Sequence, residues 1–356
     1  MKRILAFLIM LGIAFLAGCD TTQTPLQTES NFDDRLVDFD DDDEETPEQE
    51  AAALARIQAL IDAHKAERPP IKQPVLHKNA AGEEYRIQGK ITVPDDYATI
   101  QDAVNNASPG DKIKVKDGTY SEVVVVDVED VRVTAEGDVT VDGFIVEADD
   151  VEIDNFNVIP PSDSDDGIVI MAVSGVEIND NTVSNAANAI HLIGSSECLI
   201  KDNTCTDSSD GIELDNAVDN VIEENTCLRN SGDGIDLDAG SNNNEIKGNN
   251  CSDNVSSSGG GDGIDLDSGS ADMNTLEDNI CNGNGDSGIE VTGDDNTIGS
   301  DNICNNNGDD GIELRSSSDN NFVKKNEASG NGGFDIDNNG TGNTFKKNDA
   351  GTTDGV

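Results

Sequence analysis

A short phrase recurs eight times between residues 167 and 336, and this repeat constrains the fold more than any other feature of the sequence. Each copy is a small residue followed by alternating apolar and polar residues, and the copies are 22 to 29 residues apart. They begin at Gly167, Ala189, Gly211, Gly234, Gly263, Gly288, Gly311 and Gly333. Very short strands that recur at such an interval between turn residues are typical of an all-β solenoid with one coil per repeat.

Equivalent residues of successive coils should stack in columns, because parallel strands lie about 4.8 Å apart. Two columns are apolar throughout and are expected to point inward, while the alternate positions should face solvent. The inward columns are Ile168, Ile190, Ile212, Ile235, Ile264, Ile289, Ile312 and Phe334, and Ile170, Leu192, Leu214, Leu237, Leu266, Val291, Leu314 and Ile336. A column of asparagines is expected to form a structural amide ladder at left-handed turns. Its members are Asn181, Asn203, Asn225, Asn249, Asn279, Asn302, Asn326 and Asn348.

The segment upstream of the repeat predicts a capping helix and the first strands. Residues 94–110 place Ile100, Ala103 and Val104 on one face of an amphipathic helix, and short strands follow at 112–116 and 123–126. A helix is expected to cover the open end of a solenoid. This stretch resembles the start of right-handed parallel β-helix proteins of the pectin lyase-like superfamily, and the later phrases resemble their repeats. The resemblance implies a single-stranded right-handed parallel β-helix of roughly ten coils.

The first ninety residues predict an export signal and an anchor. Lys2 and Arg3 precede an apolar stretch, and Leu16-Ala17-Gly18-Cys19 resembles the lipobox of bacterial lipoproteins. The resemblance implies that Cys19 is acylated and holds the chain in a bilayer of the cell envelope, on the periplasmic side or the cell surface. The expected organisation is a signal peptide over 1–18, an acidic tether over 19–46, a helix over 47–68, a linker over 69–88, the β-helix over 89–350 and a tail over 351–356. The sequence leaves open whether the helix packs on the solenoid, pairs with another chain or acts as a spacer.

Charge and cysteine usage exclude several functions. The 73 acidic and 22 basic residues give a formal net charge of −51, which argues against nucleic acid as a partner. A solvated acidic surface suited to high salt explains this composition as well as specific cation binding does. Five of the seven cysteines share one column with valine and alanine, which predicts buried, reduced thiols. They are Cys205, Cys227, Cys251, Cys281 and Cys304.

The outward positions of the central coils carry carboxylates. Because two successive copies both read Gly-Ile-Asp-Leu-Asp, their aspartates are expected to lie close together and to repel one another. Oxygen ligands of this kind suit Ca²⁺, and no other cofactor is indicated. The predicted metal ligands are Asp236, Asp238, Asp265 and Asp267. One β-helix family serves copper delivery, but His64, His77, His191, Met171 and Met273 supply few of the soft ligands that copper prefers.

The superfamily resemblance also implies catalytic candidates. Its lyases combine Ca²⁺ with a basic residue, which points to Arg315 or His191, and its hydrolases use paired aspartates, which Asp309 and Asp310 resemble. The epimerase Asp-Pro-His-Glu and hydrolase Gly-His-Gly motifs are missing, and the chain has no Trp to line a glycan groove. The sequence therefore leaves open whether the chain is an enzyme.

Three functions follow from these observations. The leading hypothesis is an envelope-anchored lipoprotein that binds carbohydrate or another envelope polymer in a cation-dependent way. The alternatives are a Ca²⁺-dependent polysaccharide lyase or related glycan-active enzyme, and a non-catalytic structural or adhesive solenoid.

Overall fold

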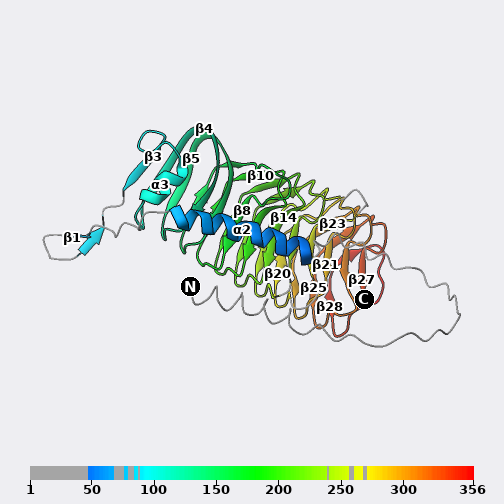
Figure 1. Ribbon diagram of the computed structural model, residues 1–356. Helices are drawn as coiled ribbons and strands as arrows, with labels where there is room; N and C mark the ends of the chain where they lie inside the picture. The colour runs from blue at the N-terminus through cyan, green and yellow to red at the C-terminus, as the bar shows by residue number, and fades with distance from the viewer. Residues whose placement is uncertain are drawn as a thin grey trace, which may run out of the picture. The chain divides into compact units, whose positions relative to one another are not determined.

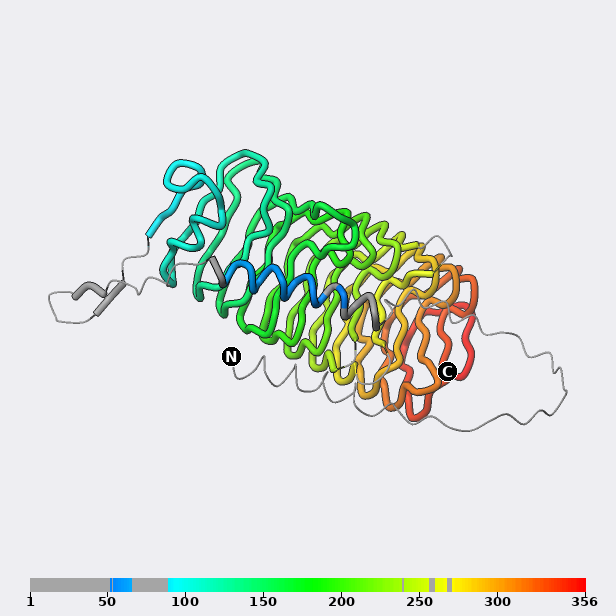
Figure 2. Tube along the Cα trace, in the orientation of Figure 1, coloured from blue at the N-terminus to red at the C-terminus, as the bar shows by residue number. Residues whose placement is uncertain are grey.

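The computed structural model describes residues 47–67, 76–78, 84–86, 89–238, 240–255, 260–267 and 271–356. Cys19 and the acidic tether therefore lie outside the described residues. From residue 89 onward, the described chain winds into a parallel β-solenoid of about 12 turns, somewhat more than the roughly ten that the repeat suggested. Its coils stack side by side from the N-terminal to the C-terminal end, as the ribbon and the Cα trace show (Figures 1 and 2).

Most coils contribute strands to three columns, which we call the first, second and third sheets; in two central coils a single bridged residue, Asn250 or Ile280, stands in place of a third-sheet strand. The first sheet contains β8 (Ile168–Met171), β11 (Asn188–Ile193), β14 (Asp210–Asp215), β17 (Ile235–Leu237), β19 (Ile264–Leu266), β21 (Ile289–Val291), β24 (Ile312–Leu314) and β27 (Ile336–Asn338). The second contains β3 (Lys90–Val93), β6 (Glu152–Asp154), β9 (Glu177–Asn179), β12 (Leu199–Lys201), β15 (Val221–Glu223), β18 (Glu245–Lys247), β20 (Thr275–Glu277), β22 (Thr297–Ile298), β25 (Phe322–Lys324) and β28 (Thr344–Lys346). The third contains β7 (Asn157–Val158), β10 (Thr182–Ser184), β13 (Thr204–Thr206), β16 (Thr226–Leu228), β23 (Ile303–Asn305), β26 (Glu327–Ser329) and β29 (Asp349–Ala350). The long strands β4 (Lys112–Val126) and β5 (Arg132–Val146) contribute to all three sheets.

The register of the first sheet confirms the inward columns except at the last coil. Ile190 pairs with both Ile168 and Ile212, as expected. At the C-terminal end, Ile312 pairs with Ile336, whereas Phe334 is 40% exposed, so the prediction of an inward Phe334 was wrong. The turn before β27 is longer by two residues than the repeat implied. A slip of two keeps the alternation of inward and outward side chains, so the sequence pattern alone did not reveal it.

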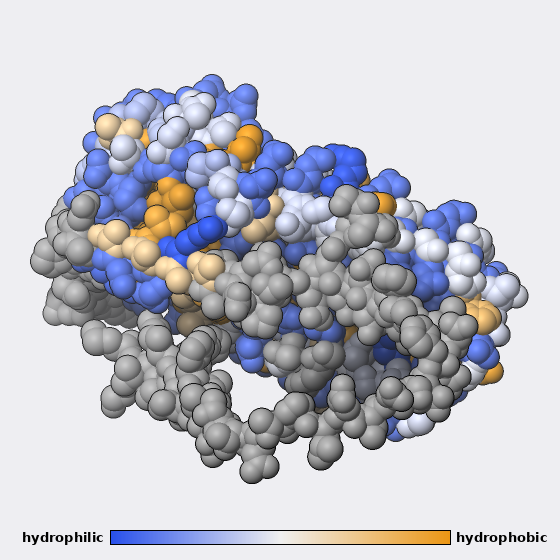
Figure 3. Space-filling view, turned by 45° about the vertical axis from the view of Figure 1, so that its right-hand side comes forward, coloured by the Kyte–Doolittle hydropathy of each residue, from blue (hydrophilic) through white to orange (hydrophobic). Residues whose placement is uncertain are grey.

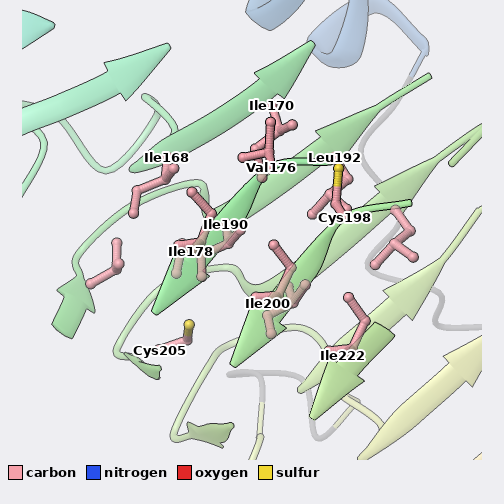
Figure 4. Close-up of a cluster of buried hydrophobic side chains, with 14 of the residues drawn as sticks. Ile168, Ile170, Val176, Ile178, Ile190, Leu192, Cys198, Ile200, Cys205 and Ile222 are labelled. Carbon is pink, nitrogen blue, oxygen red and sulfur yellow. The ribbon is translucent and has the colours of Figure 1, made fainter. Parts of the chain in front are cut away.

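Isoleucine, leucine and valine side chains fill the interior, as the close-up of the central coils shows (Figure 4). The predicted cysteine column belongs to this core, since Cys205 pairs with Cys227 on one side and Val183 on the other. The five cysteines of the column are fully buried and free, and Cys198 is a sixth buried free thiol. The column therefore acts as a row of small apolar side chains.

Amide ladders line the turns of the solenoid. In the predicted ladder, the Asn203 main-chain N–H donates to Asn225 Oδ1 (2.9 Å), and Asn203 Nδ2 donates to the carbonyl of Ile178 (2.8 Å). The left-handed φ belongs to the preceding residue, for example 55° at Asp202, and not to the Asn itself. Two further ladders join residues that the sequence did not single out. They are Asn220, Asn244, Asn274, Asn296, Asn321 and Asn343, and Asn230, Asn254, Asn284, Asn307 and Asn331.

Helix α3 (Ile100–Asn106) covers the N-terminal end of the solenoid (Figure 1). Thr99 caps it by accepting a hydrogen bond from the Asp102 main-chain N–H, and its buried face is Ile100, Ala103 and Val104. These three residues belong to the solenoid core. The helix therefore closes the open end, as predicted, although it is shorter than the 94–110 span.

Helix α2 (Pro47–Glu67) packs on the outer face of the first sheet in the N-terminal coils. Ile57 and Ile61 contact an apolar stripe formed by outward residues, namely Val125, Ile145, Val169 and Ile193. The ion pair between Lys65 and Glu147 (3.0 Å) holds one end of the contact. On the visible part of the surface, apolar residues gather toward the N-terminal coils beside this helix (Figure 3). The structure thus favours the packing alternative for this helix. The remaining described elements, β1 (Leu76–Lys78) and β2 (Glu84–Arg86), pair antiparallel.

Candidate cation site on the acidic face

Outward carboxylates form a continuous row on the first sheet beyond the coils that α2 covers. Inward isoleucine and leucine fix their direction, because side chains alternate along a strand. The parallel register stacks Glu213, Asp236, Asp265, Glu290, Glu313 and Asp337 in this row. A parallel row of acidic residues stands at the start of the strands or just before them and includes Asp210, Asp233, Asp262 and Asp310. We call these two rows the acidic face.

The predicted quartet is only partly brought together. Asp236 and Asp265 are register partners, and with Asp233 they place one carboxylate oxygen each within 4.8 Å of the others. The Oδ1 atoms of Asp236 and Asp265 are buried and accept no hydrogen bond. Burial, followed by the charge of Asp238, raises the pKa of Asp236 well above its usual value. Asp238 and Asp267 lie outside this three-residue cluster.

Two further carboxylate clusters lie along the same face. One consists of Asp262, Asp286 and Glu290, and the other of Asp309, Asp310 and Glu313, each with ligand oxygens within 4.8 Å of one another. Burial raises the pKa of Asp310 to about 7 and that of Glu313 to about 8, and neighbouring carboxylates add to both shifts. The sequence singled out Asp309 and Asp310, and Glu313, three residues further along the same coil, could have been added as an outward position of the strand.

The expectation that outward positions face solvent was wrong for several of these groups. Glu290 is 7% exposed and Glu313 is 5% exposed, although both point away from the solenoid core. Buried like charges that repel one another require protons or a cation as compensation. The raised pKa values indicate that, without a cation, protons bound to these carboxylates relieve the repulsion.

Arg315 compensates part of this charge. Its Nε and Nη2 donate to the two carboxylate oxygens of Glu290 at 2.6 and 2.7 Å, and Nε lies 3.4 Å from Glu313. The hydrogen bonds to Glu290 raise the pKa of Arg315 far above its usual value. A guanidinium held in this way is a poor proton acceptor, so the geometry disfavours Arg315 as a lyase base.

His191 is buried between two carboxylates, 3.1 Å from Asp166 and 3.5 Å from Glu213. Burial lowers its pKa, but the charge of Glu213 and the hydrogen bond to Asp166 outweigh burial and raise it to about 10. The imidazole is therefore protonated at neutral pH and cannot accept a proton there. Sequence analysis missed Asp166 as its partner, because that residue belongs to the preceding coil.

A separate hollow lies beside α2 and is mainly apolar. Its volume is about 420 Å³, and Leu60, Phe144, Ile145 and Val169 contribute to its lining. Its acidic lining residues are Asp142, Asp165 and Asp166, which precede the acidic face in the chain, so the hollow does not extend the carboxylate rows.

The donor set of the clusters fits hard cations. Among the described residues, the three groups of metal-ligating side chains that lie close together consist of aspartate and glutamate alone. Carboxylate oxygens suit Ca²⁺, Mg²⁺ or Mn²⁺, whereas copper prefers imidazole or sulfur. Met171 packs beside α2, Met273 is 53% exposed, and His191 is held between the carboxylates of Asp166 and Glu213.

Comparison with known families supports the fold. The family described as "Periplasmic copper-binding protein (NosD)" matches residues 104–270, and "Right handed beta helix region" matches residues 253–355. The solenoid is a right-handed parallel β-helix. The donor set above does not fit the copper named in the first description. No curated protein matches the sequence.

Solved structures of the same fold differ widely in what their titles name. A chain titled "Geobacillus virus E2 - ORF18" superposes with a TM-score of 0.61 at 15% identity, covering 78% of this chain and 67% of that one. A DFA-IIIase from Arthrobacter chlorophenolicus A6 without its lid gives 0.57 at 12% identity, covering 73% and 94%. The pectate lyase Pel9A gives 0.49 at 14% identity, covering 76% and 79%. At such identities the likeness to the first two chains shows the fold alone.

Proposed function

We infer that this protein is an envelope-anchored β-helix lipoprotein that binds an acidic carbohydrate or another anionic envelope polymer through divalent cations on the acidic face. One observation carries the proposal: three all-carboxylate clusters follow one another along one face of the solenoid. Repeated sites along a straight face suit a linear polymer, because successive ions can contact successive units of the same chain.

The coordination chemistry explains how a polymer would join the site. Ca²⁺ takes six to eight oxygen ligands, and a cluster of three carboxylates supplies only part of that set. The remaining positions are open to water or to carboxylate and hydroxyl groups of a glycan. The ion would also displace the protons that the raised pKa values indicate, and it would remove the repulsion between the polymer and the acidic face.

The anchoring part of the proposal rests on Leu16-Ala17-Gly18-Cys19, which lies outside the described residues. Among the residues that the structure does describe, no helix has the length and apolar character needed to cross a bilayer. Lipidation of Cys19 is therefore a proposal from sequence, tested below by membrane fractionation.

The cation proposal is tested with the soluble fragment 20–356. Ca²⁺ should raise its melting temperature more than Na⁺ at equal ionic strength, and polygalacturonate should be retained in Ca²⁺ but not in EDTA. The double variant Asp236→Asn with Asp265→Asn should lose both effects. Asp202→Asn with Asp278→Asn removes the same charge at exposed turns away from the acidic face and should keep both. Equal stabilisation by Na⁺ would reduce the acidic face to a solvated surface and favour the structural alternative.

A glycan-active enzyme is the second candidate, and the Asp309, Asp310 and Glu313 cluster favours it. Asp310 and Glu313 hold protons near neutral pH, which makes them candidate general acids beside Asp309, the third carboxyl group of the cluster. Release of reducing ends from a polysaccharide panel, lost in Asp310→Asn, would support a hydrolase. Unsaturated products would support a lyase, and retention without turnover would support the binding function.

A further inference from the structure

Four lysines gather on the last two coils of the second sheet, and we call them the lysine patch: Lys324, Lys325, Lys346 and Lys347. Lys324 at the end of β25 pairs in register with Lys346 at the end of β28. Lys325 and Lys347 follow at the adjoining turns, with φ of 55° and 60°. Lys325, Lys346 and Lys347 are exposed and Lys324 is half-buried.

The patch breaks the charge pattern of its own row. Upstream in that row, Lys201 bonds Glu223 at 2.7 Å, and Lys247 stands in register between Glu223 and Glu277. After Gly299 the alternation stops, and two lysines face each other. No ion pair found in the described part of the chain involves the lysine patch, in a protein with a net charge of −51. Like charges opposed on neighbouring strands destabilise a sheet, so a bound anion would stabilise this arrangement.

An aromatic ring organises the exposed ammonium groups. Lys346 Nζ lies 5.0 Å and Lys324 Nζ 5.5 Å from the centroid of Phe322, which is within cation–π range. The ring gathers both side chains over one point of the sheet without neutralising them. Their remaining donors are free to bind anionic oxygens.

We propose that the lysine patch is a binding site for a linear acidic glycan, independent of divalent cations. A thin chain can follow the lysine rows, whereas a flat anionic membrane would also have to approach Asp301, whose main-chain N–H donates to the Lys325 carbonyl, and Asp349, which follows Lys347 in the chain. Nucleic acid carries a higher charge density than a uronate polymer, and the acidic remainder of the protein repels it more strongly. The inference does not rest on the acidic face, since the two sites are on different sheets and bind through opposite charges.

The test measures binding of fragment 20–356 to size-defined polygalacturonate and heparin oligosaccharides in EDTA, which removes the cation-dependent route. We expect binding that weakens steeply as NaCl rises, because it is electrostatic. Lys324→Gln with Lys346→Gln should weaken it at least tenfold. Lys114→Gln with Lys201→Gln, two lysines of the same sheet that are already paired with glutamates, removes the same charge and should change it less than twofold.

Several results would overturn this inference while leaving the cation-dependent proposal intact. The first is that no oligosaccharide binds in EDTA at low salt. The second is that both double variants lose the same affinity for the oligosaccharides. The third is that vesicles rich in anionic phospholipid bind through the patch while the oligosaccharides do not. Loss of the Ca²⁺-dependent retention alone would instead affect only the acidic face.

Discussion

Replacing Asn225 with alanine should be among the more costly single changes in the solenoid. Asn225 Oδ1 accepts from the Asn203 main-chain N–H (2.9 Å) and from Asn203 Nδ2 (3.0 Å). Its Nδ2 donates to the Ile200 carbonyl (2.8 Å) and to Asn249 Oδ1 (3.0 Å). Alanine removes all four hydrogen bonds and brings no replacement.

The magnitude follows from which groups lose their last partner. Asn203 Nδ2 keeps the Ile178 carbonyl, and Asn249 Oδ1 keeps the Asn225 main-chain N–H. The buried Asn203 main-chain N–H loses its partner, at about 1 to 3 kcal/mol, whereas the Ile200 carbonyl lies in the β12–β15 ladder and loses only its side-chain donor. With the weakened side-chain bonds, we expect a loss of roughly 2 to 4 kcal/mol in unfolding free energy. Asn348 is the last, half-buried residue of the same ladder, where water can replace the amide, so Asn348→Ala should cost only about 1 kcal/mol.

Urea denaturation followed by circular dichroism would measure both variants against the wild-type fragment. The Asn225→Ala midpoint should fall clearly below that of Asn348→Ala, with a similar slope. If both variants unfold at the same urea concentration, or if Asn225→Ala loses less than about 1 kcal/mol, the hydrogen bonds of the amide ladder contribute little to the stability of the coils.

Three further predictions concern the core, the acidic face and the anchor. Cys227→Ala should lower the unfolding free energy by only about 1 kcal/mol, because valine and alanine occupy the same position in other coils. Thiol labelling of the unfolded protein should find the five column cysteines reduced. If none of the five is free, they form disulfides instead. In EDTA, the melting temperature should fall as pH rises from 5 to 8. Asp310 and Glu313 keep their protons up to about pH 7 and 8 in the folded state, but lose them near pH 3.8 and 4.5 in the unfolded chain. Ca²⁺ should reverse this trend, and an unchanged melting temperature across that range would contradict the raised pKa values. Wild-type protein should fractionate with membranes and Cys19→Ser should not, and an unmodified Cys19 within an intact chain, seen by mass spectrometry, would exclude lipidation.

The sequence predicted the fold well because the solenoid repeats its local pattern. Inward isoleucines, the asparagine ladder and the cysteine column each recur at one register, so a single chain contains many copies of the same signal. The position of Phe334 was predicted wrongly because a turn longer by two residues keeps the alternation of inward and outward side chains, but makes Ile336 the partner of Ile312. The packing of α2 also escaped it, because the stripe formed by Val125, Ile145 and Val169 is recognisable only once the coils are stacked.

The candidate site was predicted less completely, since its geometry depends on contacts between coils. Asp236 and Asp265 were predicted from their identical phrases, but Asp233 joins them from a turn whose direction the pattern does not give. The bidentate pairing of Arg315 with Glu290 and the position of His191 beside Asp166 likewise depend on neighbouring coils. Strand alternation predicts that the outward carboxylates face solvent, so their burial could be recognised only from the three-dimensional structure.

The amide ladders give the solenoid a direction. In the ladder, the asparagine main-chain N–H donates toward the C-terminal neighbour, and the side-chain Nδ2 donates to a carbonyl on the N-terminal side, as Asn203 does to Asn225 and Ile178. The two faces of a coil are therefore chemically unlike: one offers the asparagine main-chain N–H and a strand carbonyl, and the other offers the side-chain Oδ1 and Nδ2 that pair with them. A coil inserted in the opposite sense would set one main-chain N–H against another. Lengthening or shortening this protein by whole coils, whether by gene duplication or by engineering, can consequently keep the ladders intact only when every added coil runs in the same sense.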